Sequence, residues 1–107
     1  MEKWVYAVYS VCQSPGREKE FHDWYNKIHI PDILKIPGFK RANRYEIKEP
    51  PEEQGKYLAL YSIETEDINK TMALLQDTIP KLRDQGRMSD AATVVSRTLY
   101  RQIFDTG

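Results

Sequence analysis

The sequence predicts an α+β fold of ferredoxin-like βαββαβ topology, formed by a single domain over residues 1–107. Two observations support this prediction. Segments with a strand period of two alternate with segments of helical period in the order β-α-β-β-α-β. Most of the strands also carry apolar side chains on both faces, so each side of their sheet needs a cover. We expect the four strands to pair as one antiparallel sheet.

The first strand and the first helix are predicted from a change of period. Residues 4–12 (WVYAVYSVC) fill both alternating faces with β-branched and aromatic side chains, which is typical of a buried strand. From Arg17 the apolar side chains recur at helical spacing. Pro31 has no amide hydrogen and clashes with the carbonyl four residues earlier, so we expect the helix to stop or kink near His29. The apolar positions of this helix are Phe21, Trp24, Tyr25 and Ile28.

The second half of the chain repeats this alternation. Residues 39–48 and 57–64 are predicted strands, and the polar turn at 49–55 (EPPEEQG) joins them in a hairpin. Residues 68–82 place apolar side chains four and three positions apart, which predicts a second amphipathic helix ending near Gly86. Residues 93–104 form the predicted last strand.

The charge balance argues against two classes of partner. The 16 basic and 16 acidic side chains cancel, and the basic residues are scattered along the chain. Nucleic acid and anionic membranes attract proteins with a concentrated positive charge, so we expect neither partner here. No apolar run is long enough to span a membrane. Cys12 is the only cysteine and excludes an intrachain disulfide, so we expect a cytoplasmic protein.

The apolar strands predict a homodimer. Two helices can cover one face of the predicted sheet, whereas the other face would expose a patch larger than monomers usually show. A second copy of the chain, packed face to face, is the simplest cover. The alternative is a monomer with additional aromatic surface.

The segment from Phe21 to Arg44 contains the candidate site. On an ideal helix, four side chains of this segment point within about 80° of one another around the axis: His22, Tyr25, His29 and Asp32. We expect His29 to act as the general acid or base, Asp32 to fix its tautomer, and Tyr25 to donate to a developing oxyanion. Each also has a structural interpretation: Asp32 as a helix cap, Tyr25 as a core aromatic, and the fourth residue, His22, as a solvent-facing side chain.

Further polar residues are candidates for substrate binding. Arg41, Asn43 and Arg44 on the second strand either face solvent or line a polar pocket, and Arg97 and Arg101 raise the same question on the last strand. No Cys-x-x-Cys, His-x-x-x-His or acidic loop predicts a metal site, and no glycine-rich loop predicts a phosphate or dinucleotide site. We therefore expect neither a metal nor an organic cofactor. The predicted substrate contacts are His22, Trp24, Arg41, Asn43 and Tyr61.

Several motifs resemble those of the EthD-like branch of the dimeric α+β-barrel superfamily. They are Trp24-Tyr25, His29-Ile30-Pro31-Asp32, Pro37-Gly38-Phe39 and Tyr57 to Tyr61 (YLALY), within a similarity that covers about residues 3–65. The resemblance implies a homodimer of facing four-stranded sheets, with a pocket between sheet and helices in each protomer. The superfamily includes monooxygenases, polyketide cyclases, dehydratases and lyases.

The functional expectation is a small-molecule enzyme that uses acid–base chemistry on a carbonyl or phenolic compound, as a lyase, dehydratase, cyclase or isomerase does. Two alternatives stay open. One is a non-catalytic ligand-binding or accessory dimer that supports a partner enzyme. The other is a monooxygenase, either cofactor-free or haem-using.

Overall fold

A computed structural model, described for residues 1–51 and 55–107, contains a single four-stranded antiparallel sheet in the order β2-β3-β1-β4. The strands are β1 (Glu2–Cys12), β2 (Phe39–Glu46), β3 (Tyr57–Thr65) and β4 (Ala92–Arg101). The predicted topology and the β2–β3 hairpin are confirmed. β4 ends three residues before the predicted end, and residues 52–54 of the predicted turn lie outside the described residues.

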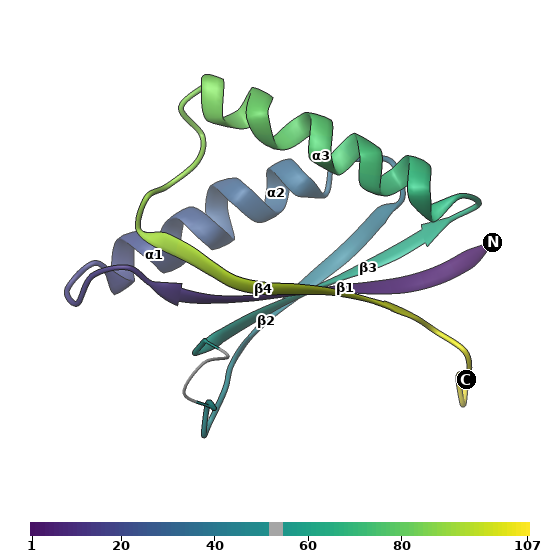
Figure 1. Cartoon of the computed structure of the whole chain (residues 1–107), viewed down its shortest axis with the longest axis horizontal. Helices are drawn as coiled ribbons and strands as arrows, with labels where there is room; N and C mark the ends of the chain where they lie inside the picture. Colours follow the sequence, from purple (N-terminus) through teal and green to yellow (C-terminus); the bar gives the residue numbers. More distant parts are fainter. Residues whose placement is uncertain (52–54) are drawn as a thin grey trace.

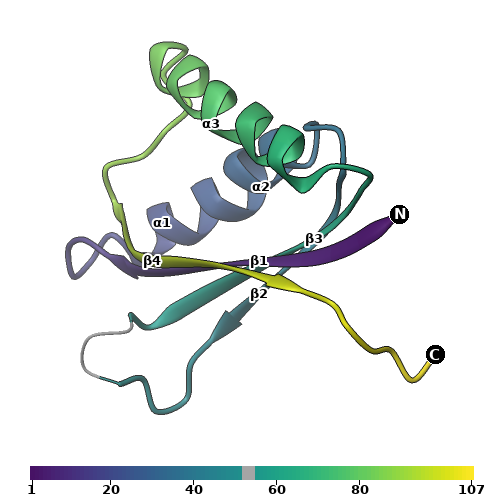
Figure 2. The ribbon, with the colours of Figure 1, turned by 45° about the vertical axis from the view of Figure 1, so that its right-hand side comes forward.

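The helices all lie on one face of the sheet (Figures 1 and 2). They are α1 (Glu18–Trp24), a π-helical turn at Tyr25–His29, α2 (Ile30–Ile33) and α3 (Ile68–Asp84). At the start of α3 the Asp67 carboxylate caps the helix by accepting from the backbone N–H groups of Asn69 and Lys70. In the described part of the chain, no helix has the length and apolarity that crossing a membrane requires.

The helical run continues through Pro31, so the first helix does not stop near His29, but a π-helical turn that ends at His29 interrupts its regular geometry. The backbone widens into the π-helical turn just before the proline, where the N–H of Ile30 donates to the carbonyl of Tyr25, five residues back. Pro31 then lies in the first turn of α2, directly after the turn whose wider spacing accommodates a residue without an N–H. The widened turn contains one more residue than an α-helical turn. The side chains after it are therefore turned around the helix axis, relative to an ideal helix, by about the angle that one residue contributes.

The core lies between the helices and the inner face of the sheet. Phe21, Trp24 and Tyr25 are buried against the inward side chains of β3, which alternate with outward ones along the strand. At the start of β2, Gly38 adopts a φ of +99°, and a Cβ atom there would lie 3.2 Å from a Thr71 methyl group. This turn therefore requires glycine. The inward residues of β3 are Tyr57, Ala59, Tyr61 and Ile63.

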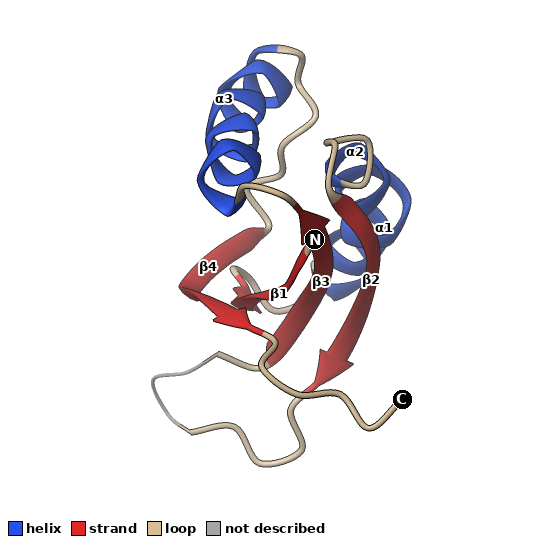
Figure 3. Ribbon diagram, turned by 90° about the vertical axis from the view of Figure 1, so that its right-hand side faces the viewer, coloured by secondary structure: helices blue, strands red, loops and turns tan. Residues whose placement is uncertain are grey.

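The outer face of the sheet has no helix over it (Figure 3). The strand register places alternate residues on this face, and many of them are apolar. Tyr45 and Tyr100 are 49% and 52% exposed there. The C-terminal segment after Arg101 leaves the sheet on the side away from the helices (Figures 1 and 2), with Ile103 and Phe104 exposed. We call this the bare face, with apolar residues Val5, Ala7, Tyr9, Val11, Tyr45, Leu58, Leu60 and Tyr100.

Candidate functional site

A cavity of about 160 Å³ lies between the sheet and the helices. Its walls come from β1, β3 and β4 on one side and from α1, the π-helical turn, α2 and α3 on the other. A cavity of about 150 Å³ accommodates a benzene-sized molecule. Arg83 and Arg97 are the only charged residues among the described residues that line it. The aromatic and imidazole side chains that line it are those of Tyr6, Trp24, Tyr25, His29 and Tyr61.

His29 lines this cavity, where aromatic rings rather than a carboxylate surround it. Its imidazole stacks on Trp24 at 4.6 Å and meets Tyr25 edge-on at 5.4 Å. The Trp24 indole is itself held by a hydrogen bond from Nε1–H to the carbonyl of Arg87, at 2.8 Å. His29 Nδ1 is buried and has no hydrogen-bond partner among the described residues. Burial lowers the pKa of His29 to about 4, against the opposing charge of Asp32, so the imidazole is neutral at pH 7.

Tyr61 and Tyr25 supply phenol groups to the same cavity. The Tyr61 hydroxyl is buried, and its one polar neighbour among the described residues is the Tyr25 hydroxyl, with which it forms no hydrogen bond of good geometry. Burial raises the pKa of Tyr61 well above its usual range, and the neighbouring Tyr25 adds to the effect. Burial also raises the pKa of Tyr25, partly offset by the Arg44 guanidinium, which lies 4.3 Å from the ring centre. Both phenols are therefore protonated donors at neutral pH.

Asp32 does not orient His29. Its carboxylate forms a two-point ion pair with Arg87, at 2.6 Å to Nε and 3.0 Å to Nη2, and lies 3.8 Å from Lys35 Nζ. The hydrogen bonds from Arg87 hold the pKa of Asp32 below its usual value. The Asp32 side chain is buried, so the pair fastens α2 to the loop after α3. No hydrogen bond joins Asp32 to His29 within the described ranges.

His22 lies outside the cavity, beside Arg44 on β2. The Arg44 Nη1 donates to His22 Nδ1 and to the Asn26 side-chain oxygen, both at 3.0 Å. Burial, followed by the Arg44 charge, lowers the pKa of His22. The ideal-helix spacing that grouped His22 with His29 fails because the π-helical turn separates them and rotates the later residue away.

The predicted contacts Arg41 and Asn43 lie on the bare face, on the opposite side of the sheet from the cavity. Alternation along β2 instead turns Arg44 toward the helices, where it packs over aromatic rings. On β4 the same alternation turns Arg97 toward the cavity. Arg83 was not predicted, although it lies four residues after Ile79 on the apolar stripe of α3, and that spacing could have identified it.

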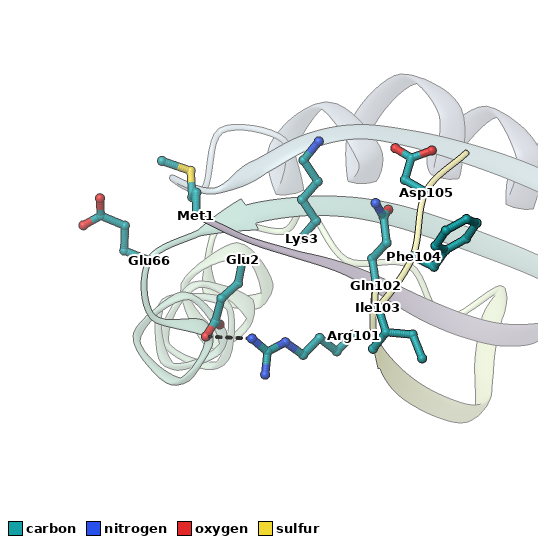
Figure 4. A pocket seen from close by; sticks show the side chains of 9 residues that line it. All are labelled: Met1, Glu2, Lys3, Glu66, Arg101, Gln102, Ile103, Phe104 and Asp105. Carbon is teal, nitrogen blue, oxygen red and sulfur yellow. Dashed lines mark ion pairs between the residues drawn. The ribbon is translucent and has the colours of Figure 1, made fainter. Parts of the chain in front are cut away.

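A larger groove of about 630 Å³ lies where the C-terminal segment separates from the start of β1 (Figure 4). Glu2 and Arg101 face each other across it at 3.8 Å. Of the predicted site residues in the described part of the chain, Arg101 alone lines this groove, and none of the described buried polar atoms without a partner lies in it. We therefore place the candidate site in the smaller cavity. Within residues 1–51 and 55–107, no three His, Cys, Asp or Glu side chains gather where they could hold a metal ion.

The fold and the position of the cavity define a ferredoxin-like α+β protein with a pocket between its sheet and its helices. Residues 4–102 match the family described as "Domain of unknown function (DUF4286)", so the chain belongs to that family. The EthD-like assignment is not confirmed. Its motif residues Trp24, Tyr25 and Phe39 are core residues, and Gly38 is a turn glycine, so the fold itself accounts for them. No curated protein matches the chain.

Solved structures of low sequence identity share the fold. A dimeric ferredoxin-like protein from an uncultured marine organism aligns with a TM-score of 0.67 at 12% identity, covering 99% of this chain and all of that one. A variant of MhuD with two manganese protoporphyrin IX molecules bound per active site gives 0.64 at 15%, covering 100% and 99%. A candidate monooxygenase from Shewanella loihica PV-4 gives 0.56 at 15%, covering 98% and 99%. At these identities the likeness shows the fold.

Proposed function

We propose that this protein is a small-molecule enzyme whose cavity takes a single-ring phenolic compound and removes its proton, with His29 as the base. The observation that supports this role is the pairing of a neutral, unpartnered imidazole with a buried phenol donor, Tyr61, in one aromatic-walled cavity. A buried polar group without a partner is costly in the free protein, and a ligand that satisfies it recovers that cost. Tyr61 would donate to the substrate oxygen while His29 accepts its proton. The low pKa makes His29 a weak base in the free protein, and the phenolate that forms beside it would raise that pKa and stabilise the imidazolium.

The reaction class we favour is cofactor-free monooxygenation, which the similarity in fold to a candidate monooxygenase supports. Deprotonation gives a phenolate that is electron-rich enough to reduce O₂. The oxygen then adds at the para carbon, and loss of the para hydrogen with hydroxide leaves a quinone. One oxygen atom enters the product and the other leaves as water, so a phenol plus O₂ gives a quinone plus H₂O. Acid–base conversion without O₂, as in a lyase or isomerase, shares the first step.

A haem-using reaction fits this site poorly, although a fold neighbour binds a porphyrin. The cavity has room for about one aromatic ring.

The test measures O₂ uptake and product formation with simple phenols, in the wild type and in His29→Ala and His29→Gln variants. Loss of a general base should lower the rate about 10²–10⁴-fold. His22→Gln is the matched control, because it removes the other histidine from outside the cavity. Turnover without O₂ uptake would replace oxygenation with acid–base chemistry. Binding without any turnover would favour the ligand-binding or accessory protein, and unchanged activity in both His29 variants would refute the catalytic role.

We also propose that the protein functions as a homodimer joined through the bare face. Its apolar residues, together with the exposed Ile103 and Phe104, offer apolar surface for a second copy. A fold neighbour is described as dimeric. A Leu60→Glu variant should sediment as a monomer in analytical ultracentrifugation, because the facing copies would bury two carboxylates. Glu20→Gln on the helical side is the control. A wild type that sediments as a monomer would exclude this assembly.

A further inference from the structure

We propose that the ligand of the cavity carries a carboxylate, and that Arg83 and Arg97 bind it at the opening. This inference rests on the proposed function for the identity of the ring, and it adds the group that the ring carries. Two arginines support a carboxylate on the ligand. They approach the cavity from opposite walls, Arg83 from the last turn of α3 and Arg97 from the inward side of β4.

Both arginines line the cavity and are also exposed to solvent, so they stand where the cavity meets water. His29 and the Tyr61 hydroxyl are the more deeply placed polar groups. A guanidinium presents its N–H donors in a fixed fork that matches a carboxylate. A ligand with a phenol at one end and a carboxylate at the other would satisfy both regions at once.

The charges around the two arginines are unbalanced. Among the described residues, no Asp or Glu lines the cavity and neither Arg83 nor Arg97 forms an ion pair. Three other arginines do have acidic partners: Arg17 pairs with Glu20 and Asp90, Arg87 with Asp32, and Arg101 with Glu2. The cavity therefore has a net positive opening that favours an anion.

Arg97 lies close enough to the cavity phenols to influence them. Its charge opposes the rise that burial imposes on the pKa of Tyr6 and of Tyr25. A carboxylate placed beside Arg97 would thus rest against aromatic walls. This geometry gives the ligand one orientation, with the carboxylate outward and the phenol toward His29, which is the orientation that proton removal requires.

The test compares two probes of nearly equal shape, 3-hydroxybenzoate and 3-hydroxybenzamide, by calorimetric titration at low and high salt. The wild type should bind the acid about tenfold more tightly than the amide, and added salt should reduce that preference. Arg97→Gln and Arg83→Gln should each weaken acid binding by about three- to tenfold and leave amide binding unchanged. Arg97→Lys keeps the charge and should retain part of the preference.

Two controls remove one positive charge from the same elements without altering the cavity lining: Lys81→Gln on α3 and Arg101→Gln on β4. Both should bind the two probes like the wild type. Equal affinities for acid and amide in the wild type, equal losses for both probes in the arginine variants, or binding of neither probe would overturn the proposal. Acid preference without turnover would refute the enzyme and leave this inference intact, whereas turnover of neutral phenols without acid preference would do the reverse.

Discussion

Replacement of His29 by Gln should remove most of the pH dependence of stability between pH 5 and pH 7.5. The pKa of His29 is about 4 in the folded protein and about 6.5 in an unfolded chain. Between these values the unfolded chain binds a proton that the folded protein excludes. The free energy of unfolding therefore rises with pH through this window, and the stabilisation is fully present above about pH 6.5 and lost as the pH falls toward 4.

The magnitude follows from the two pKa values. At pH 7.5 both states are almost entirely deprotonated at this residue, so its linkage contribution to unfolding is close to zero. At pH 5 the unfolded imidazole is almost fully protonated and the folded one is about one-tenth protonated. The difference amounts to about 2 kcal/mol of lost stability. Carboxyl groups with lowered pKa values act mainly below this window, because their unfolded pKa is about 4.

Urea denaturation of the wild type, His29→Gln and His22→Gln at the two pH values provides the measurement. The wild type should lose about 2 kcal/mol more than His29→Gln on going from pH 7.5 to pH 5. Each protein is compared with itself, so a change in overall stability caused by the substitution cancels. His22→Gln should keep most of the wild-type loss. A full pH dependence in His29→Gln, or a His29 midpoint near 6.5 by NMR, would refute the argument that burial holds this imidazole neutral.

Two further substitutions separate binding from stability. Tyr61→Phe should change the free energy of unfolding by less than about 1 kcal/mol, because the lost hydroxyl makes no hydrogen bond of good geometry. The same variant should bind phenol more weakly by calorimetry, and a marked loss of stability would show that the hydroxyl has a structural role instead. Asp32→Asn should have a lower melting temperature than the wild type at pH 7. This difference in melting temperature should vanish as the pH falls through the lowered pKa of Asp32. A difference that persists in acid would mean that the ion pair with Arg87 is not its source.

The periodicity of the sequence was sufficient to predict most of the fold. Apolar alternation in β1 and β3 and the helical stripe of α3 depend on local side-chain spacing, which the chain carries directly. The predicted end of β4 was wrong because Ile103 and Phe104 continue the apolar pattern of the strand, although both lie in the exposed C-terminal segment. An apolar pattern does not by itself show which surface covers it.

The candidate site was only partly predictable. His29, Tyr25, Trp24 and Tyr61 line one cavity, and inspection of the first helix and the third strand nominated all four. Arg83 shares a stripe with Ile79 and was within reach of the same reasoning. Arg87 could not be predicted in this way, because its partner Asp32 lies 55 positions earlier and no local pattern joins two residues so far apart.

The sequence alone determined the order of the elements, the position of the apolar stripes and the choice of His29 as the candidate histidine, since these follow from residue types at short spacing. Only the tertiary structure decided the partners of each polar group. The π-helical turn before Pro31 rotated His29 away from His22, and the loop after α3 brought Arg87 to Asp32. Strand alternation turned Arg97 into the cavity and Arg41 to the bare face. Side-chain chemistry is local, whereas charge pairing and burial depend on contacts that only the folded chain creates.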